Sequence, residues 1–257
     1  MSSVNVEVRG AIAYVTLSNP GKLNALSANM WRDLASAFKR LAEDAPLRCI
    51  VVRGADGNFA AGADIEEFEQ LRRTPEDGIR YHTELVGGAL EAIASCPHPT
   101  VAAIEGACVG GGLEIACACD LRIAAPSARF GIPINRLGFA LAPLELQGLL
   151  ALAGPAVARE MLLEGRVFDA EEAKEKGLLH RIADDVHAEA DATAQRIAHG
   201  APLAARANKA LIRRLTASAA PLSERELQDA FACLSSDDYH EGVQAFLEKR
   251  PPRFTGR

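Results

Sequence analysis

Apolar and polar residues alternate at the start of the chain. Residues 4–8 and 11–17 are both rich in valine and isoleucine, and Arg9-Gly10 separates them. Alternation with a period of two predicts strands, and a short glycine-containing break between two such runs predicts a β-hairpin. The chain is therefore expected to begin with a pair of hydrogen-bonded strands.

The pattern then changes to the spacing of a helix. After Ser27, which can cap a helix, apolar residues recur on one helical face, at Met30, Leu34, Phe38 and Leu41. Residues 49–52 follow as a continuous apolar run, which predicts a buried strand. A strand, a helix and a strand in this order predict a β-α-β unit with parallel strands.

A second unit of the same kind is expected to follow. It has a helix at about residues 76–95, a strand at residues 100–104, a helix that begins near Gly111 and a strand at residues 121–124. After about Pro143 the strands run out, and helical segments dominate at residues 144–153, 157–163, 170–176, 184–198, 202–215 and 223–235. This helical tail has more apolar residues than a solvated extension needs, so it is expected to pack on its own core or on another subunit.

The composition is that of an ordinary globular protein. The chain has 257 residues, of which 49% are hydrophobic and 24% are charged, and its formal net charge is -6. This balance argues against disorder and against a general nucleic-acid surface. The first residues lack the basic and apolar regions of a secretory signal, and no apolar run reaches the roughly 18 residues that indicate a membrane span. A cytoplasmic protein with no nucleic-acid or membrane partner is expected.

The six cysteines are expected to be small buried residues with free thiols. They lie scattered in apolar contexts, without paired CxxC spacing or nearby histidines, at Cys49, Cys96, Cys108, Cys117, Cys119 and Cys233. This distribution argues against both disulfides and zinc ligands.

Three consecutive glycines are the first candidate for chemistry. The segment Val109-Gly-Gly-Gly-Leu-Glu114 opens an apolar stretch in which Glu114 is the one carboxylate. Because a helix is expected to begin here, unobstructed amides and the positive end of the helix dipole can face a polarised oxygen. The residues after the glycines fit neither a phosphate-binding P-loop nor a dinucleotide-binding loop. Close packing of the helix is the alternative explanation.

A second loop of small residues, Asn58-Phe-Ala-Ala-Gly-Ala-Asp64, follows a predicted strand. Gly62 can turn the chain so that the amide of Ala63 points into a cleft, although a loop of this kind is often only a turn. A thioester whose α-carbon loses or gains a proton passes through an enolate, and paired backbone donors stabilise that charge. Together, the two loops suit such a reaction.

The sequence resembles the crotonase superfamily, that is, the enoyl-CoA hydratase and isomerase family. The similarity is clearest at residues 60–65, 102–124 and 241–254, and it extends over nearly the whole chain. The resemblance implies an α/β fold, with a spiral of ββα units at residues 1–196 and a helical C-terminal trimerisation region at residues 197–257. It also implies acyl-CoA thioesters as substrates, as in fatty acid β-oxidation, no further cofactor, and a trimer or a dimer of trimers.

The same resemblance assigns roles to single residues. The oxyanion donors would be the amides of Ala63 and Gly111, and Glu114 would be the acid/base. The CoA nucleotide and pantetheine would lie along Lys22, Leu23, Ala61 and Ile65, although Lys22 also fits a solvated surface lysine and Leu23 a core residue. Phe246 and Lys249 would reach the CoA of a neighbouring subunit.

The chain departs from the family pattern where the reaction is decided. Family hydratases have a second glutamate twenty residues after the first, and that position here is Ile134. The glycine-rich turn that normally follows is replaced by Phe139-Ala-Leu-Ala-Pro-Leu-Glu145. Glu145 is a possible second acid, or it is a first-turn glutamate favoured by the helix dipole. Ile134 and Phe139 are expected beside the acyl group, and the depth of that pocket depends also on Phe68, Leu137 and Leu144.

Three functions remain open on these residues. Hydration of a 2-enoyl-CoA is the leading expectation, because one carboxylate can in principle pass on the proton that it takes from water. A double-bond isomerase needs one base and is the first alternative, although many family isomerases keep the second acid and lose the first. An acyl-CoA-binding homologue with little activity is the second alternative. None of the six histidines has a spacing that indicates a role.

Overall fold

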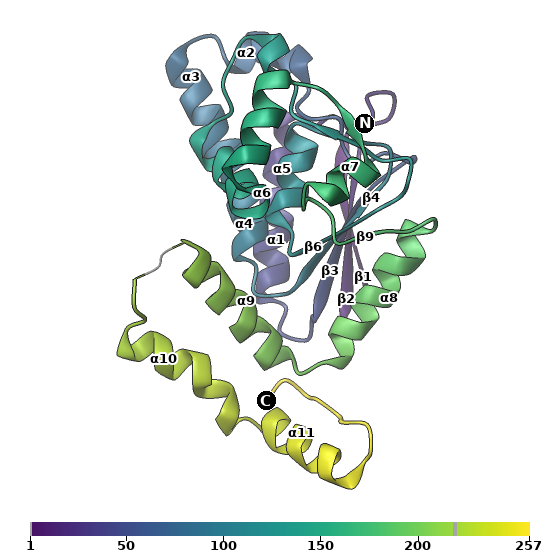
Figure 1. Ribbon diagram of the computed structural model, residues 1–257, viewed down its shortest axis with the longest axis vertical. Coiled ribbons are helices and arrows are strands. Elements are labelled where there is room, and N and C mark those ends of the chain that lie inside the picture. The colour runs from purple at the N-terminus through teal and green to yellow at the C-terminus, as the bar shows by residue number, and fades with distance from the viewer. Residues whose placement is uncertain (1, 218–219) are drawn as a thin grey trace.

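A six-stranded sheet forms the centre of this protein (Figure 1). The computed structural model describes residues 2–217 and 220–257, apart from the side chains of residues 227, 230 and 233. The first two strands form the expected antiparallel hairpin, and all the remaining neighbouring strands of this sheet pair in parallel. The strand order across the sheet is β1 (Ser3–Arg9), β2 (Ile12–Ser18), β3 (Cys49–Gly54), β4 (Thr100–Ile104), β6 (Leu121–Ala124) and β9 (Arg181–Ile182).

A second, three-stranded sheet contains β5 (Ala107–Val109), β7 (Arg129–Gly131) and β8 (Phe168–Asp169). The prediction that strands run out after about Pro143 was wrong, because β8 and β9 both lie beyond that residue. Each of these two strands has only two residues, which is too short for an alternating pattern to be visible. Their pairing with β7 and β6 is set by the tertiary structure.

Helices cover both faces of the large sheet. Helices α1 (Ala28–Glu43), α4 (Gly87–Ser95) and α5 (Gly111–Ala118) lie on one face, and α8 (Val186–His199) lies on the other (Figure 1). Alternate residues of the strands enter two separate cores, so that Val15 packs toward α1 while Tyr14 packs toward α8. Burial on both faces explains why the central strands are continuous apolar runs. The Ser27 hydroxyl caps α1, as predicted, by accepting a hydrogen bond from the Met30 amide.

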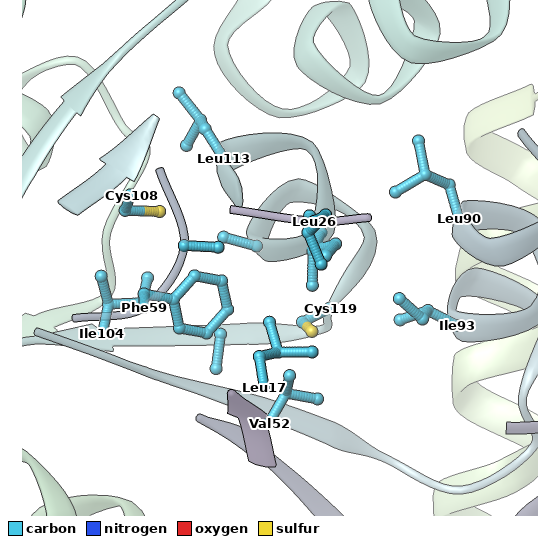
Figure 2. Packing of buried hydrophobic residues seen from close by; sticks show 14 of the residues in the cluster. Leu17, Leu26, Val52, Phe59, Leu90, Ile93, Ile104, Cys108, Leu113 and Cys119 are labelled. Carbon is cyan, nitrogen blue, oxygen red and sulfur yellow. The ribbon is translucent and has the colours of Figure 1, made fainter. Parts of the chain in front are cut away.

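The larger core also fixes the two loops of small residues. Figure 2 shows Phe59, at the start of one loop, packed in the same cluster as Cys108, just before the glycines, and Leu113, just after them. All three side chains are almost completely buried. The loops are therefore anchored on both sides by the core.

The helix predicted at about residues 76–95 is divided into three parts. An α-helix, α3 (Pro75–Arg80), leads into a π-helical segment, η2 (Tyr81–Val86), and then into α4. A Cβ on Gly87 would lie 2.9 Å from the His82 carbonyl oxygen and 3.1 Å from Leu144 Cδ1, so this glycine permits a close approach of α6 (Pro143–Glu164). π-Helical turns of this kind are frequent at functional sites.

Helix α6 (Pro143–Glu164) joins the two helical segments predicted at residues 144–153 and 157–163. Gly154 has non-helical backbone angles and Pro155 follows it, so the helix is kinked between the two segments. Among the described residues, α6 is the one helix that length and composition alone would allow to cross a membrane, a test that core helices of soluble proteins also pass. It contacts both α4 and α5.

The C-terminal part of the chain is helical, as expected. After α7 (Ala170–Glu175) and α8 come α9 (Pro202–Ala217), α10 (Glu224–Phe231), η4 (Ala232–Ser235) and α11 (Asp237–Glu248). Figure 1 shows α10 and α11 standing away from the sheet and its covering helices. The expected domain border after residue 196 falls within α8 and stays a prediction.

The five cysteines whose side chains are described are free, as expected, and all except Cys117 are buried. The sixth, Cys233, has a side chain outside the described part of the structure. Burial raises the pKa of the Cys117 and Cys119 thiols to about 12, so neither is a reactive thiolate at neutral pH.

Candidate active site

The two loops of small residues lie against each other. The Ala60 amide donates a hydrogen bond to the Ala107 carbonyl at 2.8 Å, and the Val109 amide donates one to the Ala60 carbonyl at 3.0 Å. Gly62 then turns the chain with a φ of +101°, and a Cβ on Gly62 would lie 3.2 Å from the Val109 carbonyl oxygen. A glycine is needed at residue 62 for both its backbone angle and this close approach.

The amide of Ala63 is free because of the way this loop pairs with Leu26. The Leu26 amide donates to the Gly62 carbonyl at 2.7 Å, and the Asp64 amide donates to the Leu26 carbonyl at 2.9 Å. In this parallel bridge, the N–H of Ala63 points away from Leu26. It donates no hydrogen bond to any described residue.

The amide of Gly111 is free for a different reason. Gly111 is the first residue of α5, so its N–H has no partner within the helix. Gly110, just before it, has a φ of +52° and donates its own N–H to the Gly131 carbonyl at 2.9 Å. Neither amide donates to a described residue, so Ala63 and Gly111 provide two free donors on adjacent loops, as an oxyanion hole requires. Their catalytic role stays a prediction.

Glu114 lies in the first turn of α5 and is buried, with 9% of its surface exposed. Its carboxyl group accepts no hydrogen bond from the described part of the chain. Burial raises the pKa of Glu114 well above the usual value, and the nearby charge of Glu145 raises it further. Glu114 therefore keeps its proton at pH values where most glutamates are ionised.

This raised pKa predicts an effect on stability. The folded pKa of Glu114 lies above the unfolded one, so its contribution to stability is present below pH 4.5 and is lost as the pH rises toward the folded pKa. Glutamine at residue 114 cannot ionise, so at neutral pH Glu114→Gln is expected to unfold at a higher temperature than the wild type. Its free energy of unfolding should be higher by about 1.4 kcal/mol for each unit by which the folded pKa of Glu114 is raised. Thermal unfolding between pH 4.5 and 8 measures this difference, which should grow with pH; a constant or shrinking difference would contradict the burial argument.

Glu145 is the second buried carboxylate of the site. It lies in the first turn of α6 with 4% of its surface exposed, and its Oε2 accepts a hydrogen bond from the Ala142 amide at 3.3 Å. The interpretation as a first-turn glutamate is therefore correct. However, its Oε1 also lies 2.6 Å from His82 Nδ1, and its charge acts on Glu114. The charge of Glu145 is thus near enough to act on Glu114, and its role as a second acid stays a prediction.

His82 is a site residue that the sequence did not indicate. It lies 63 positions from Glu145 in the sequence and belongs to no motif, so only the fold brings the two together. The π-helical segment η2 carries His82, and Gly87 permits α6 to approach it. The 2.6 Å contact requires a proton between the ring nitrogen and the carboxylate, so the imidazole holds Glu145 in one orientation.

Ile134 occupies the position of the second family glutamate, at the start of η3 (Ile134–Leu137). Its side chain is half-buried and packs against the larger core. This position therefore carries an apolar contact in place of an acid.

Three aromatic residues and an arginine lie beside this pair of carboxylates. Phe68 begins α2 (Phe68–Leu71), and its ring contacts Tyr81 and Phe139 edge-on, at centroid distances of 6.0 and 6.4 Å. The Phe139 ring lies 6.2 Å from the His82 ring. The guanidinium of Arg72 packs against both Phe68 and Phe139, at 4.3 and 4.2 Å from their ring centres. Two residues expected to line the acyl pocket, Phe68 and Phe139, therefore do lie together near Glu145.

The four residues expected along CoA also come together. The Ala61 amide donates to the Leu23 carbonyl at 3.0 Å, and Leu23 and Ile65 are large apolar residues with 54% and 53% of their surface exposed. Lys22 is already bound to two carboxylates, Asp64 at 2.7 Å and Glu66 at 2.8 Å. These two hydrogen bonds, of which the one with Asp64 has the larger effect, raise the pKa of Lys22 to about 12. CoA binding by these residues stays a prediction, as does that by Phe246, which is 83% exposed, and Lys249.

A metal centre is not formed by the described side chains, among which no group of three or more histidines, cysteines or carboxylates could hold an ion. The polar groups that the described residues bring together at the candidate site are two amides, two carboxyl groups and one imidazole.

Comparison with known proteins gives a consistent result. Residues 7–257 match the enoyl-CoA hydratase/isomerase family. A probable enoyl-CoA hydratase of Mycobacterium tuberculosis is 38% identical and is covered over 98% of its length by 99% of this chain. A probable enoyl-CoA hydratase of Bacillus subtilis is 35% identical with full coverage of both chains. A crystal structure of an enoyl-CoA hydratase/carnitine racemase from Magnetospirillum magneticum has a TM-score of 0.96 and 46% identity, covering 100% of this chain and 97% of the other.

Proposed function

Because the chain belongs to the enoyl-CoA hydratase/isomerase family, we propose that it adds water across the double bond of a 2-enoyl-CoA. The observation that carries this proposal is the pair of buried carboxyl groups, Glu114 and Glu145, beside two unpaired amides. Hydration needs a base for the water and an acid for the α-carbon. An isomerase would need only one of the two.

The raised pKa of Glu114 suggests how the two roles are divided. Glu145, held by His82 and by the Ala142 amide, takes a proton from water as the water oxygen bonds to the β-carbon. The electrons of the double bond move toward the thioester oxygen, and the amides of Ala63 and Gly111 stabilise the resulting enolate. Glu114 then gives its proton to the α-carbon. Transfer of the new proton from Glu145 to Glu114 restores the starting state.

The test is the variant Glu145→Gln, which keeps the size of the side chain and an oxygen for the Ala142 amide. Loss of the base is expected to lower crotonyl-CoA hydration by about 10²-fold or more. Isomerisation of a 3-enoyl-CoA should change much less, because loss of the Glu145 charge favours the ionised form of Glu114, which alone can move that proton. Steady-state rates with both substrates measure the difference.

Glu91→Gln is the matched control for that experiment, because Glu91 is an exposed glutamate paired with Arg213 and should affect neither reaction. A wild-type enzyme that isomerises faster than it hydrates, with both rates unchanged in Glu145→Gln, would make the protein an isomerase. Binding of acyl-CoA without turnover of either substrate would make it an acyl-CoA-binding homologue.

Members of this family act on acyl-CoA thioesters and often form oligomers. We propose that this protein needs no cofactor beyond its CoA thioester and works in the cytoplasm as a trimer or a dimer of trimers. Exposed apolar side chains on α10 and α11 support an assembly of this kind, because Phe231, Phe246 and Leu247 are 62%, 83% and 69% exposed.

A further inference from the structure

Arg72 lies beside the candidate active site, and its positive charge is paired with no described residue. Its side chain donates no hydrogen bond to any described residue, and its Nη1 is completely buried. By contrast, the neighbouring Arg73 is exposed and donates from its Nε to the Glu69 carbonyl at 3.0 Å. A guanidinium has five N–H donors, and burying one of them unsatisfied has a substantial free-energy cost.

The surroundings of Arg72 provide apolar contact but no anion that it binds. Its guanidinium packs against the rings of Phe68 and Phe139, and the centre of the Tyr81 ring is 5.8 Å away. Glu145 is near enough to act on Arg72 electrostatically, but its two oxygens are bound to His82 and to the Ala142 amide. The guanidinium of Arg72 is therefore packed against two rings, and no described carboxylate pairs with its donors, whose planar arrangement suits a planar anion.

The position of Arg72 indicates which part of a substrate would supply that anion. It contacts Phe139 and lies near Glu145, one of the two carboxylates assigned to the reaction at the α- and β-carbons. The residues expected along the CoA nucleotide form a separate group, in which Lys22 is the cation. An anion at Arg72 therefore belongs with the acyl chain, and the phosphates of CoA belong with the other group.

We propose that the acyl group of the substrate ends in a carboxylate, and that Arg72 binds it. The substrate class is thus the mono-CoA thioesters of short unsaturated dicarboxylic acids. This inference rests on the proposed function for the identity of the reaction, but binding of a carboxylate by Arg72 can be measured without any turnover.

The test compares binding of two saturated thioesters that cannot be hydrated, glutaryl-CoA and butyryl-CoA, by calorimetry. The wild type is expected to bind glutaryl-CoA about 10- to 100-fold more tightly, the range typical of a charge-assisted hydrogen-bonded pair. Arg72→Gln should abolish this preference and leave butyryl-CoA binding unchanged. Arg72→Lys, which keeps the charge but loses the planar fork, should retain part of the preference. Arg73→Gln is the matched control and should behave as the wild type.

Two results would overturn the proposal: equal affinity of the wild type for both thioesters, or an equal loss of affinity for both in Arg72→Gln. The second result would mean that Arg72 acts on the site in general, for example through Glu145. Rates with glutaconyl-CoA and crotonyl-CoA separate this inference from the proposed function. A preference for glutaryl-CoA that depends on Arg72, in a protein that hydrates neither enoyl-CoA, would support the role of Arg72 while contradicting the hydratase.

Discussion

Glu114→Gln is expected to lower kcat for 2-enoyl-CoA hydration by about 10²- to 10⁴-fold, the range typical of a general acid or base. Glutamine has nearly the same shape as glutamate but cannot donate a proton to the α-carbon. KM should change little, because the carboxyl group makes no hydrogen bond that would be lost from the described structure. Initial rates of crotonyl-CoA hydration over a range of substrate concentrations separate the two constants.

The control for this prediction is the unfolding temperature of the same variant. Since Glu114→Gln is expected to be more stable than the wild type at neutral pH, a loss of activity cannot then be attributed to unfolding. Equal activity in the two proteins would remove Glu114 from the mechanism.

Gly111→Pro is expected to lower kcat by about 10²- to 10³-fold, the cost of removing one oxyanion donor. Proline lacks the N–H that Gly111 would offer to the thioester oxygen. It is accepted at the first position of a helix, which is the position of Gly111 in α5. The matched control is Gly111→Ala, which keeps the N–H.

Alanine and proline both place a Cβ at residue 111, and this Cβ would lie about equally close to Trp31 in the two variants. A Cβ on Gly111 would lie 2.9 Å from Trp31 Cζ2. The comparison of the two variants therefore controls for crowding by the Cβ, while the proline ring also occupies the position of the lost N–H. If Gly111→Ala and Gly111→Pro lose the same activity, the amide of Gly111 has no catalytic role.

The elements with a periodic pattern were predictable from the sequence. The hairpin of β1 and β2, the cap of α1 at Ser27, and the parallel strands β3, β4 and β6 follow from local pattern and turn residues. The strands β8 and β9 were not predictable, because two residues carry no period. The π-helical segment η2 was missed because its apolar spacing resembles that of an α-helix, while its geometry depends on the contact of Gly87 with α6.

The sequence by itself determined the part of the site that lies within single segments. Gly62 with Ala63, and Gly111 with Glu114, are close in the chain, and their backbone geometry depends on glycines that can be recognised locally. The resemblance to a family added the substrate class, and the match over residues 7–257 confirmed that family.

Only the tertiary structure decided which second carboxylate lies near enough to act on Glu114. Ile134 marks the loss of the usual acid, but nothing in the sequence relates Glu145 to His82, or Arg72 to Phe139, because each pair comes from segments far apart in the chain. Their contact depends on how closely α6 and the loop before it approach η2 and α2. The distance between these elements is set by side-chain packing, at Gly87 and at the contact of the Phe68 and Phe139 rings. The pattern of hydrophobic residues along the chain does not specify this distance.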